Sequence, residues 1–154
     1  MSFRDFKYKL NNKISVFHSA LSVRERLEQW KRVKKGEATI IIGTRSAVFA
    51  PAENIGLIIV DEEQEHTYKS EQNPRFHARD VAKFRCYENN ALLLLASATP
   101  SFESYALAKA GKYSLYELKK RYGEAKLPIM GIDAASLGIV QASVLPTSLS
   151  CTFR

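Results

Sequence analysis

The sequence predicts an α/β protein built around a doubly wound, mainly parallel β-sheet. Three short apolar runs, at residues 40–42, 57–60 and 92–95, each lead directly into a polar motif. Unbroken apolar runs of this length are typical of strands that are buried on both faces, as in a parallel sheet. The intervals between the runs leave room for crossover helices, which is the pattern of a doubly wound sheet.

The first 17 residues predict a short helix followed by a strand. Phe3, Phe6 and Leu10 lie close to helical spacing, and Asn11-Asn12 signals a turn. Residues 14–17 then predict the strand.

A second helix is predicted from residue 23 to Gly36. Ser22 and Glu25 have the spacing of a capping box, and Gly36 stops the helix. An apolar stripe on one face is expected to pack against the sheet: Val23, Leu27, Trp30 and Val33. Because Trp30 is in register with this stripe, we interpret it as a core residue and not as a platform for stacking bases.

The run at residues 57–60 leads into side chains that suit nucleotide chemistry. Asp61, Glu62 and Glu63 are consecutive carboxylates, and Gln64 follows them. They fall at the carboxyl end of a predicted parallel strand, where open α/β sheets bind their ligands. Nucleotide hydrolysis needs one carboxylate to hold Mg²⁺ and another to orient the attacking water. The alternative is a buried strand followed by an acidic turn.

The run at residues 40–42 leads into a turn that can grip a phosphate. Gly43 permits close backbone approach, Thr44 and Ser46 offer hydroxyls, and Arg45 offers a planar charged fork. The alternative is an ordinary turn with a salt-bridged Arg45.

Residues 65–77 form a polar, aperiodic segment in which aromatic and basic side chains are interleaved. This mixture suits single-stranded nucleic acid, because bases stack on rings while cations meet phosphates. The candidates are Tyr68, Lys69, Arg75, Phe76 and His77, with Arg79 just beyond. Alternatively, Tyr68 or Phe76 anchors the segment to the core. His66 and His77 lack a pattern of metal-ligand spacing, so no metal site is expected there.

The remaining elements continue the alternation of helices and strands. Residues 78–87 predict a helix in which Cys86 is a small core residue. The run at 92–95 leads into Ser97-Ala98-Thr99-Pro100, and a helix follows to about Ala110. Residues 113–118 predict a last strand, which the basic stretch 119–123 follows.

Charge and cysteine content limit the classes of function. Residues 1–35 hold ten of the 23 Lys and Arg but three of the 16 Asp and Glu, which accounts for the formal net charge of +7. A basic end suits a phosphate backbone, and a solvated helix face explains it equally well. Two cysteines give neither a disulfide framework nor a zinc quartet. With no signal peptide and no run of ~20 apolar residues, a cytoplasmic protein is expected.

Taken together, the motifs resemble superfamily 2 helicases, and specifically replication-restart DNA helicases of the PriA type. The resemblance covers roughly residues 14–128 and rests on the order and spacing of several strings: His18-Ser19-Ala20-Leu21-Ser22, 42–47, 54–65, Tyr68-Lys69, 74–82 and 97–101. The string at 74–82 argues against other nucleic-acid translocases of superfamily 2.

The resemblance implies a RecA-like (P-loop NTPase-type) motor lobe that uses ATP and Mg²⁺. It implies that Asp61 holds Mg²⁺ and Glu62 positions the hydrolytic water, with Glu63 and Gln64 completing the catalytic motif. Single-stranded or forked DNA and other primosome proteins are the implied partners.

The resemblance also assigns three segments to DNA binding or to its coupling with ATP hydrolysis. The turn Gly43-Thr44-Arg45-Ser46 lies along the DNA strand in such helicases. The aromatic-rich segment from Tyr68 to Arg79 couples DNA occupancy to hydrolysis. Ser97, Ala98 and Thr99 link the state of the γ-phosphate to the grip on DNA.

Three features depart from the pattern of this family. The sequence contains no Gly-x-x-x-x-Gly-Lys-Ser/Thr loop, since Ala106 and Tyr113 occupy the consensus positions around Gly111-Lys112. From residue 129 onward the resemblance stops, and neither a second lobe with an arginine finger nor a cysteine-rich zinc region is found. Gln64 stands where the family usually has His, and Gln can still hydrogen-bond across the site.

We therefore expect residues 1–128 to form a partial helicase ATP-binding lobe without the P-loop segment, and 129–154 to be a non-family tail, frame-shifted or disordered. The expected function is that of a fragment of an ATP-dependent 3′-to-5′ DNA helicase in replication restart, inactive in hydrolysis by itself. The alternatives are a non-catalytic, basic nucleic-acid-binding fragment and a non-functional truncated product. The sheet is expected to be incomplete at its N-terminal side. Residues 92–96 should then present an unpaired edge, unless residues 139–145 cover it.

Overall fold

The computed structural model describes residues 13–118 and 138–143. Within these ranges the elements follow in chain order as β1 (Ile14–Phe17), α2 (Val23–Lys34), β2 (Ile40–Gly43), the 3-10 helix η1 (Arg45–Phe49), β3 (Leu57–Val60), the 3-10 helix η2 (His66–Tyr68), β4 (Lys69–Ser70), β5 (Phe76–His77), α3 (Ala78–Glu88), β6 (Leu92–Ser97), α4 (Phe102–Lys109), β7 (Ser114–Leu118) and β8 (Gly138–Ser143). The expected helix near residues 3–10, the turn at 11–12 and the basic stretch 119–123 lie outside the described residues.

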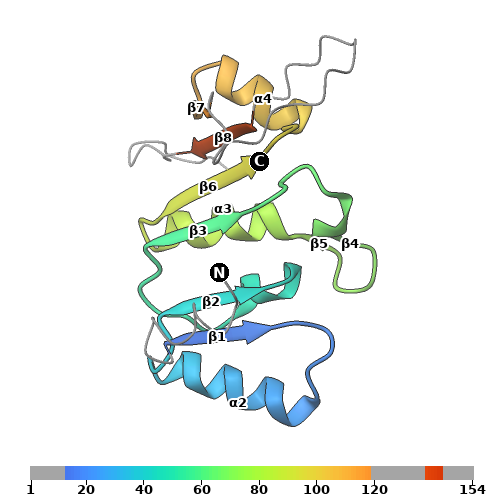
Figure 1. The fold of residues 1–154 in the computed structure, drawn as a ribbon, viewed down its shortest axis with the longest axis vertical. Coiled ribbons are helices and arrows are strands. Elements are labelled where there is room, and N and C mark those ends of the chain that lie inside the picture. The colour runs from blue at the N-terminus through green and yellow to red at the C-terminus, as the bar shows by residue number, and fades with distance from the viewer. Residues whose placement is uncertain (1–12, 119–137, 144–154) are drawn as a thin grey trace, which may run out of the picture.

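Figure 1 shows the strands following one another along the long axis of the molecule. The order is β1, β2, β3, β6 and β8, with α2 beside β1 and α3 against β3 and β6. Hydrogen bonds join the described strands into a parallel pair β1–β2, a sheet of order β3-β6-β8-β7 and a small hairpin β4–β5. The predicted α/β class with parallel strands is confirmed. No described helix is long and apolar enough to cross a lipid bilayer.

Helix α2 begins as its sequence predicts. The Ser22 hydroxyl accepts a hydrogen bond from the backbone N–H of Glu25 at 3.3 Å, and the Glu25 carboxylate accepts one from the backbone N–H of Ser22 at 2.8 Å. Both halves of the capping box are therefore present.

The expected burial of the apolar stripe on α2 is wrong for three of its four residues. Val33 is buried, but Val23, Leu27 and Trp30 are 85%, 50% and 38% exposed. The physical reason is the narrow sheet beside the helix. The described strands there form only the pair β1–β2, and α2 packs mainly on β1. Of the stripe, Val33 alone joins the buried cluster of Phe17, Ala38 and Ala50.

Strands β3 and β6 pair in parallel, with Leu57 opposite Leu92 and Val60 opposite Leu95. Helix α3 connects them and packs on one face of the pair. The core between helix and sheet consists of Val60, Ala82, Cys86, Ala91, Leu93 and Leu95. Cys86 is completely buried there, as its sequence context predicts.

The expectation that β3 is buried on both faces is wrong. Leu57 and Ile59 are 48% and 57% exposed, whereas Val60 is 6% exposed. In a strand, alternate side chains point to opposite faces. Among the described residues, one face of β3 packs against α3 and the face that carries Leu57 and Ile59 remains open.

The second edge of β6 is occupied. β8 pairs with it in antiparallel orientation, with Leu93 opposite Ser143 and Ser97 opposite Ile139, and β7 pairs with the far side of β8. The expectation that residues 92–96 form an unpaired edge is therefore wrong. The less expected alternative, coverage from the segment 139–145, holds for residues 139–143, the part of that segment that the structure describes.

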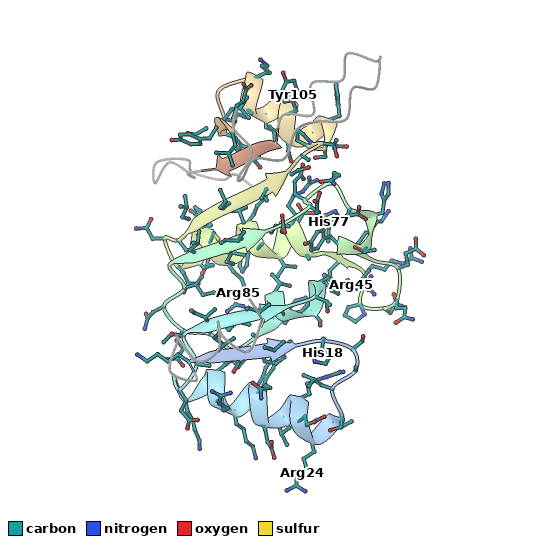
Figure 2. All side chains as sticks on the ribbon, viewed as in Figure 1. His18, Arg24, Arg45, His77, Arg85 and Tyr105 are labelled. Atoms are coloured by element: carbon teal, nitrogen blue, oxygen red, sulfur yellow. The ribbon has the colours of Figure 1, made fainter. Side chains whose placement is uncertain are left out.

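The Arg85 guanidinium connects α3 to the residues that follow β2. Arg85 donates through Nη1 to the carbonyl oxygens of Val48 at 2.6 Å and Ala50 at 2.8 Å, and through Nη2 to that of Ala52 at 3.0 Å. Figure 2 shows Arg85 between the β1–β2 pair and β3. Since β2 and β3 belong to separate hydrogen-bonded sheets, Arg85 fixes residues 48–52 against the half that contains β3 and β6.

Candidate nucleotide site and DNA-coupling hairpin

The carboxyl ends of β1, β2, β3 and β6 lie on the same side of the molecule, where the hairpin β4–β5 also lies (right side of Figure 1). The three polar motifs of the sequence follow β2, β3 and β6. Parallel strands place such residues at one edge of the sheet, which is where α/β proteins bind their ligands.

Asp61 and Glu62 are exposed at the end of β3. The Asp61 carboxylate accepts a hydrogen bond from the backbone N–H of Glu62 at 3.0 Å, and Glu62 has a positive φ of 47°. The described residues contain no cluster of three or more metal-binding side chains. The pair of Asp61 and Glu62 nevertheless fits Mg²⁺, because this ion commonly binds one or two carboxylates together with substrate phosphates.

Gln64 and Ser97 connect the carboxylates to the end of β6. Gln64 donates through Nε2 to the Glu62 carboxylate at 2.8 Å, and its Oε1 accepts a hydrogen bond from the Ser97 hydroxyl. Ser97 Oγ in turn accepts the backbone N–H of Thr99 at 2.9 Å. Gln64 thus makes the cross-site hydrogen bond expected of it. The structure brings Glu62, Gln64, Ser97 and Thr99 together, with Ala98 exposed between the last two.

Glu63 differs from its neighbours, because it is 2% exposed and points into the protein. Burial by itself would raise the pKa of Glu63, but hydrogen bonds from Ser101 and Arg79 outweigh it and lower that pKa. The sequence grouped Glu63 with the catalytic carboxylates, and in the structure its oxygens are hydrogen-bonded to Ser101, Ser104 and Arg79.

The turn after β2 contacts both the strand beside it and the hairpin. A Cβ on Gly43 would lie 2.5 Å from the carbonyl oxygen of Phe17, so only glycine fits there without a shift of the backbone. Arg45 donates through Nη1 to the carbonyl oxygens of Thr67 at 3.1 Å and Lys69 at 3.0 Å. The alternative of a salt-bridged Arg45 does not hold, since its described partners are carbonyls. Thr44 and Ser46 are exposed.

Aromatic side chains anchor the segment of residues 65–77 to the protein. The Tyr68 hydroxyl donates to the carbonyl oxygen of Asp61 at 2.6 Å, and burial together with nearby carboxylates raises the pKa of Tyr68. The rings of Phe76 and Phe49 pack edge to face, with centroids 4.8 Å apart. These contacts favour anchoring for Tyr68 and Phe76, one of the two alternatives that the sequence left open.

The polar residues of the hairpin have two different environments. His77 caps α3 by accepting the backbone N–H of Arg79 at 3.2 Å, and burial together with the Arg79 charge lowers the pKa of His77. Lys69 and Arg75 are exposed and therefore accessible to a phosphate backbone. Figure 2 shows Arg45 and His77 on the same side of the molecule.

Sequence reasoning missed three residues that shape this site. Ser101 and Ser104 bind the Glu63 carboxylate, and Arg85 holds residues 48–52. The signal that could have identified Ser101 is a serine at the start of a predicted helix, and in the structure Ser101 is the N-cap of α4. Nothing in the local sequence distinguishes Ser104 or Arg85 from ordinary helix residues.

Comparison with known proteins agrees with this geometry. The family model of the DEAD/DEAH box helicases matches residues 2–107. Replication restart protein PriA from Bacillus subtilis is 43% identical over 123 residues, which is 80% of this chain and 15% of that protein. PriA from Chlamydia trachomatis is 48% identical over 117 residues, 75% of this chain and 16% of that protein.

The chain thus spans about one sixth of the length of the curated relatives that it matches. The predicted resemblance to PriA-type proteins is confirmed at this level of identity. With its carboxylates at the end of β3, its Ser-Ala-Thr motif at the end of β6 and a match over residues 2–107, the chain belongs to the DEAD/DEAH box helicase family.

Proposed function

We propose that this chain is part of the ATP-binding lobe of an ATP-dependent DNA helicase that acts in replication restart. The observation that carries the proposal is the hydrogen-bonded path from Glu62 through Gln64 to Ser97 and Thr99. This path joins the Glu62 carboxylate to the Ser-Ala-Thr motif after β6. A displacement of the carboxylate therefore changes the position of the motif. In this proposal the strands belong to one RecA-like, doubly wound sheet.

The exposed carboxylates divide the work of hydrolysis. Asp61 would hold Mg²⁺, and Glu62 would orient the attacking water and accept its proton. When bound, the ion would supply positive charge against the phosphates. Gln64 holds the Glu62 carboxylate in place through one hydrogen bond. Its second hydrogen bond, to Ser97, links the position of that carboxylate to the end of β6.

The second part of the proposal concerns single-stranded or forked DNA. The exposed Thr44 and Ser46 of the turn and the exposed Lys69 and Arg75 of the hairpin are the groups available to phosphates. Arg45 ties the turn to the hairpin through Thr67 and Lys69, so both surfaces move as one unit. Movement in the 3′-to-5′ direction, primosome proteins as partners and a cytoplasmic location complete the proposal by family resemblance.

A chimera tests this function. Residues 14–118 of this chain replace the matching segment of full-length Bacillus subtilis PriA, and ATP hydrolysis is measured with and without single-stranded DNA. We expect DNA-stimulated hydrolysis in the chimera. Glu62→Gln should lower kcat by about 10²–10⁴-fold, the usual contribution of a positioned general base. Glu65→Gln, a charge-matched change at an exposed neighbour, is the control.

The isolated 154-residue chain belongs in the same assay. We expect it to release no phosphate above background, because its sequence has no Gly-x-x-x-x-Gly-Lys-Ser/Thr loop to cradle the phosphates. A folded chimera that binds DNA but does not hydrolyse ATP, or one in which Glu62→Gln retains the parent rate, would contradict the proposed function.

A further inference from the structure

Glu63 lies in a buried polar cluster that the proposed hydrolysis does not use. Its carboxylate accepts the backbone N–H of Ser101 at 2.6 Å, the hydroxyls of Ser101 and Ser104 at 3.1 Å each, and Nη1 of Arg79 at 2.7 Å. Arg79 Nη1 also lies 3.0 Å from the Ser101 hydroxyl and 3.1 Å from the Ser104 hydroxyl. The four side chains therefore form one connected network.

The network joins three elements at the point where each begins or ends. Glu63 follows β3 and donates its backbone N–H to the carbonyl oxygen of Ala96 in β6 at 3.0 Å. Arg79 is in the first turn of α3, directly after hairpin strand β5. Ser101 caps α4 and comes two residues after Thr99, the last residue of the path that starts at Glu62.

Because the ion pair between Glu63 and Arg79 is buried, its stability depends strongly on the position of both side chains. The side chains of Glu63 and Arg79 are 1% and 15% exposed. When one member of a buried ion pair is displaced, the charge of the other is left uncompensated away from water. A movement of the hairpin that shifts Arg79 must therefore be followed by Glu63 and by the cap of α4.

We propose that Glu63 and Arg79 form a positioning pair that couples the hairpin β4–β5 to the Ser97–Ser101 segment. Glu63 is in this assignment not a catalytic carboxylate, because its oxygens are occupied inside the protein. That the hairpin contacts DNA and that residues 97–101 respond to the nucleotide rests on the proposed function. The coupling between the two segments requires only the contacts of Glu63 and Arg79.

Hydrogen exchange of the whole 154-residue chain, followed by mass spectrometry, tests the pair without any hydrolysis. In Glu63→Gln, which keeps the size of the side chain but loses its charge, we expect exchange to accelerate about tenfold or more in residues 69–77 and in residues 97–104 together. Exchange in residues 14–43 should be unchanged. Glu103→Gln, an equal charge change at an exposed position in the first turn of α4, should match the parent.

Further variants complete the test. Arg79→Lys should reproduce the pattern of Glu63→Gln, and the double variant should add little, because both changes break the same interaction. Ser104→Ala removes one of the four hydrogen bonds to the Glu63 carboxylate, together with the contacts of the Ser104 hydroxyl to Arg79 and Ser101, and keeps the charge pair. It gives a milder version of the same pattern if Glu63→Gln does not fold. Faster exchange confined to residues 97–104, uniformly faster exchange or no change would each overturn the proposal. Since no nucleotide is involved, these outcomes are independent of the chimera assay.

Discussion

At the scale of single residues, the adjacent carboxylates Glu62 and Glu63 have opposite surroundings. Glu62 is exposed and accepts a hydrogen bond from Gln64, whereas Glu63 is buried and accepts hydrogen bonds from Ser101, Ser104 and Arg79. One is available to a ligand and the other holds three elements together. This difference has a consequence for the pH dependence of stability.

The pKa of Glu63 is lowered in the folded protein relative to its ordinary value of 4.5. A lowered pKa means that folding favours the ionised form. The resulting stabilisation is complete above about pH 4.5 and is lost as the pH falls through the lower pKa of the folded state. Urea unfolding at several pH values should show the free energy of unfolding decreasing below about pH 4.5. This part of the decrease should be absent in Glu63→Gln, and the same pH profile in both proteins would contradict the assignment.

The four residues Asp61 to Gln64 also show where prediction from sequence stops. Their position at the end of a strand follows from an apolar run and was predicted correctly. The division between exposed and buried carboxylates depends on Ser101 and Ser104, which lie about 40 residues further along the chain and arrive with α4. No pattern within the motif carries that information.

At the scale of elements, Arg85 of α3 makes a polar contact with residues 48–52, which form the end of η1 and the residues just after it. Its guanidinium binds three carbonyl oxygens, and burial lowers its pKa. Carbonyl groups of an irregular segment need partners when they are taken from water. Arg85 thus supplies for residues 48–52 what a neighbouring strand supplies elsewhere.

Replacing Arg85 by Met keeps much of the side-chain length and removes all three hydrogen bonds. We expect the free energy of unfolding to fall by at least about 1.5–3 kcal/mol, the usual range for a single hydrogen bond to a charged group. Arg26→Met, an exposed change on α2, should stay within about 0.5 kcal/mol of the parent. Urea denaturation measures both. Equal stability of Arg85→Met and the parent would show that water satisfies these carbonyls.

Features that depend only on residues close in sequence, such as helix caps, were predicted correctly. The burial of side chains, which depends on distant parts of the chain, was not. The capping box of Ser22 and Glu25 needs only four consecutive residues, and it forms. The stripe of Val23, Leu27 and Trp30 has the correct spacing but is covered only in part, because the described sheet beside α2 has just the two strands β1 and β2. Periodicity identifies the apolar face of a helix, whereas the extent of the sheet decides how much of that face is covered.

At the scale of the whole molecule, β8 extends the sheet beyond β6. Residues 138–143 pair with β6 on one side and with β7 on the other, so β8 is an inner strand of the four. An unpaired apolar strand edge is a template for pairing with other molecules. β8 therefore protects β6 from intermolecular contacts.

Val140→Pro tests this protection, because Val140 stands opposite Ala96 of β6 and Tyr116 of β7. Proline removes a backbone donor from the middle of an inner strand and should expel it. We expect the variant to form dimers or larger species at concentrations where the parent is monomeric, as measured by light scattering after size exclusion. Val140→Thr keeps the donor and should behave as the parent. A monomeric Val140→Pro protein would show that β8 is not needed.

The pairing of β8 with the second edge of β6 has a kinetic consequence. β3 runs parallel to β6 on one side and β8 runs antiparallel on the other, so both hydrogen-bonding edges of β6 are in use. Any other strand that takes the place of β8, from this molecule or another, has to wait until those hydrogen bonds open. The dissociation rate of β8, and not the concentration of the incoming strand, then limits how fast such an exchange proceeds.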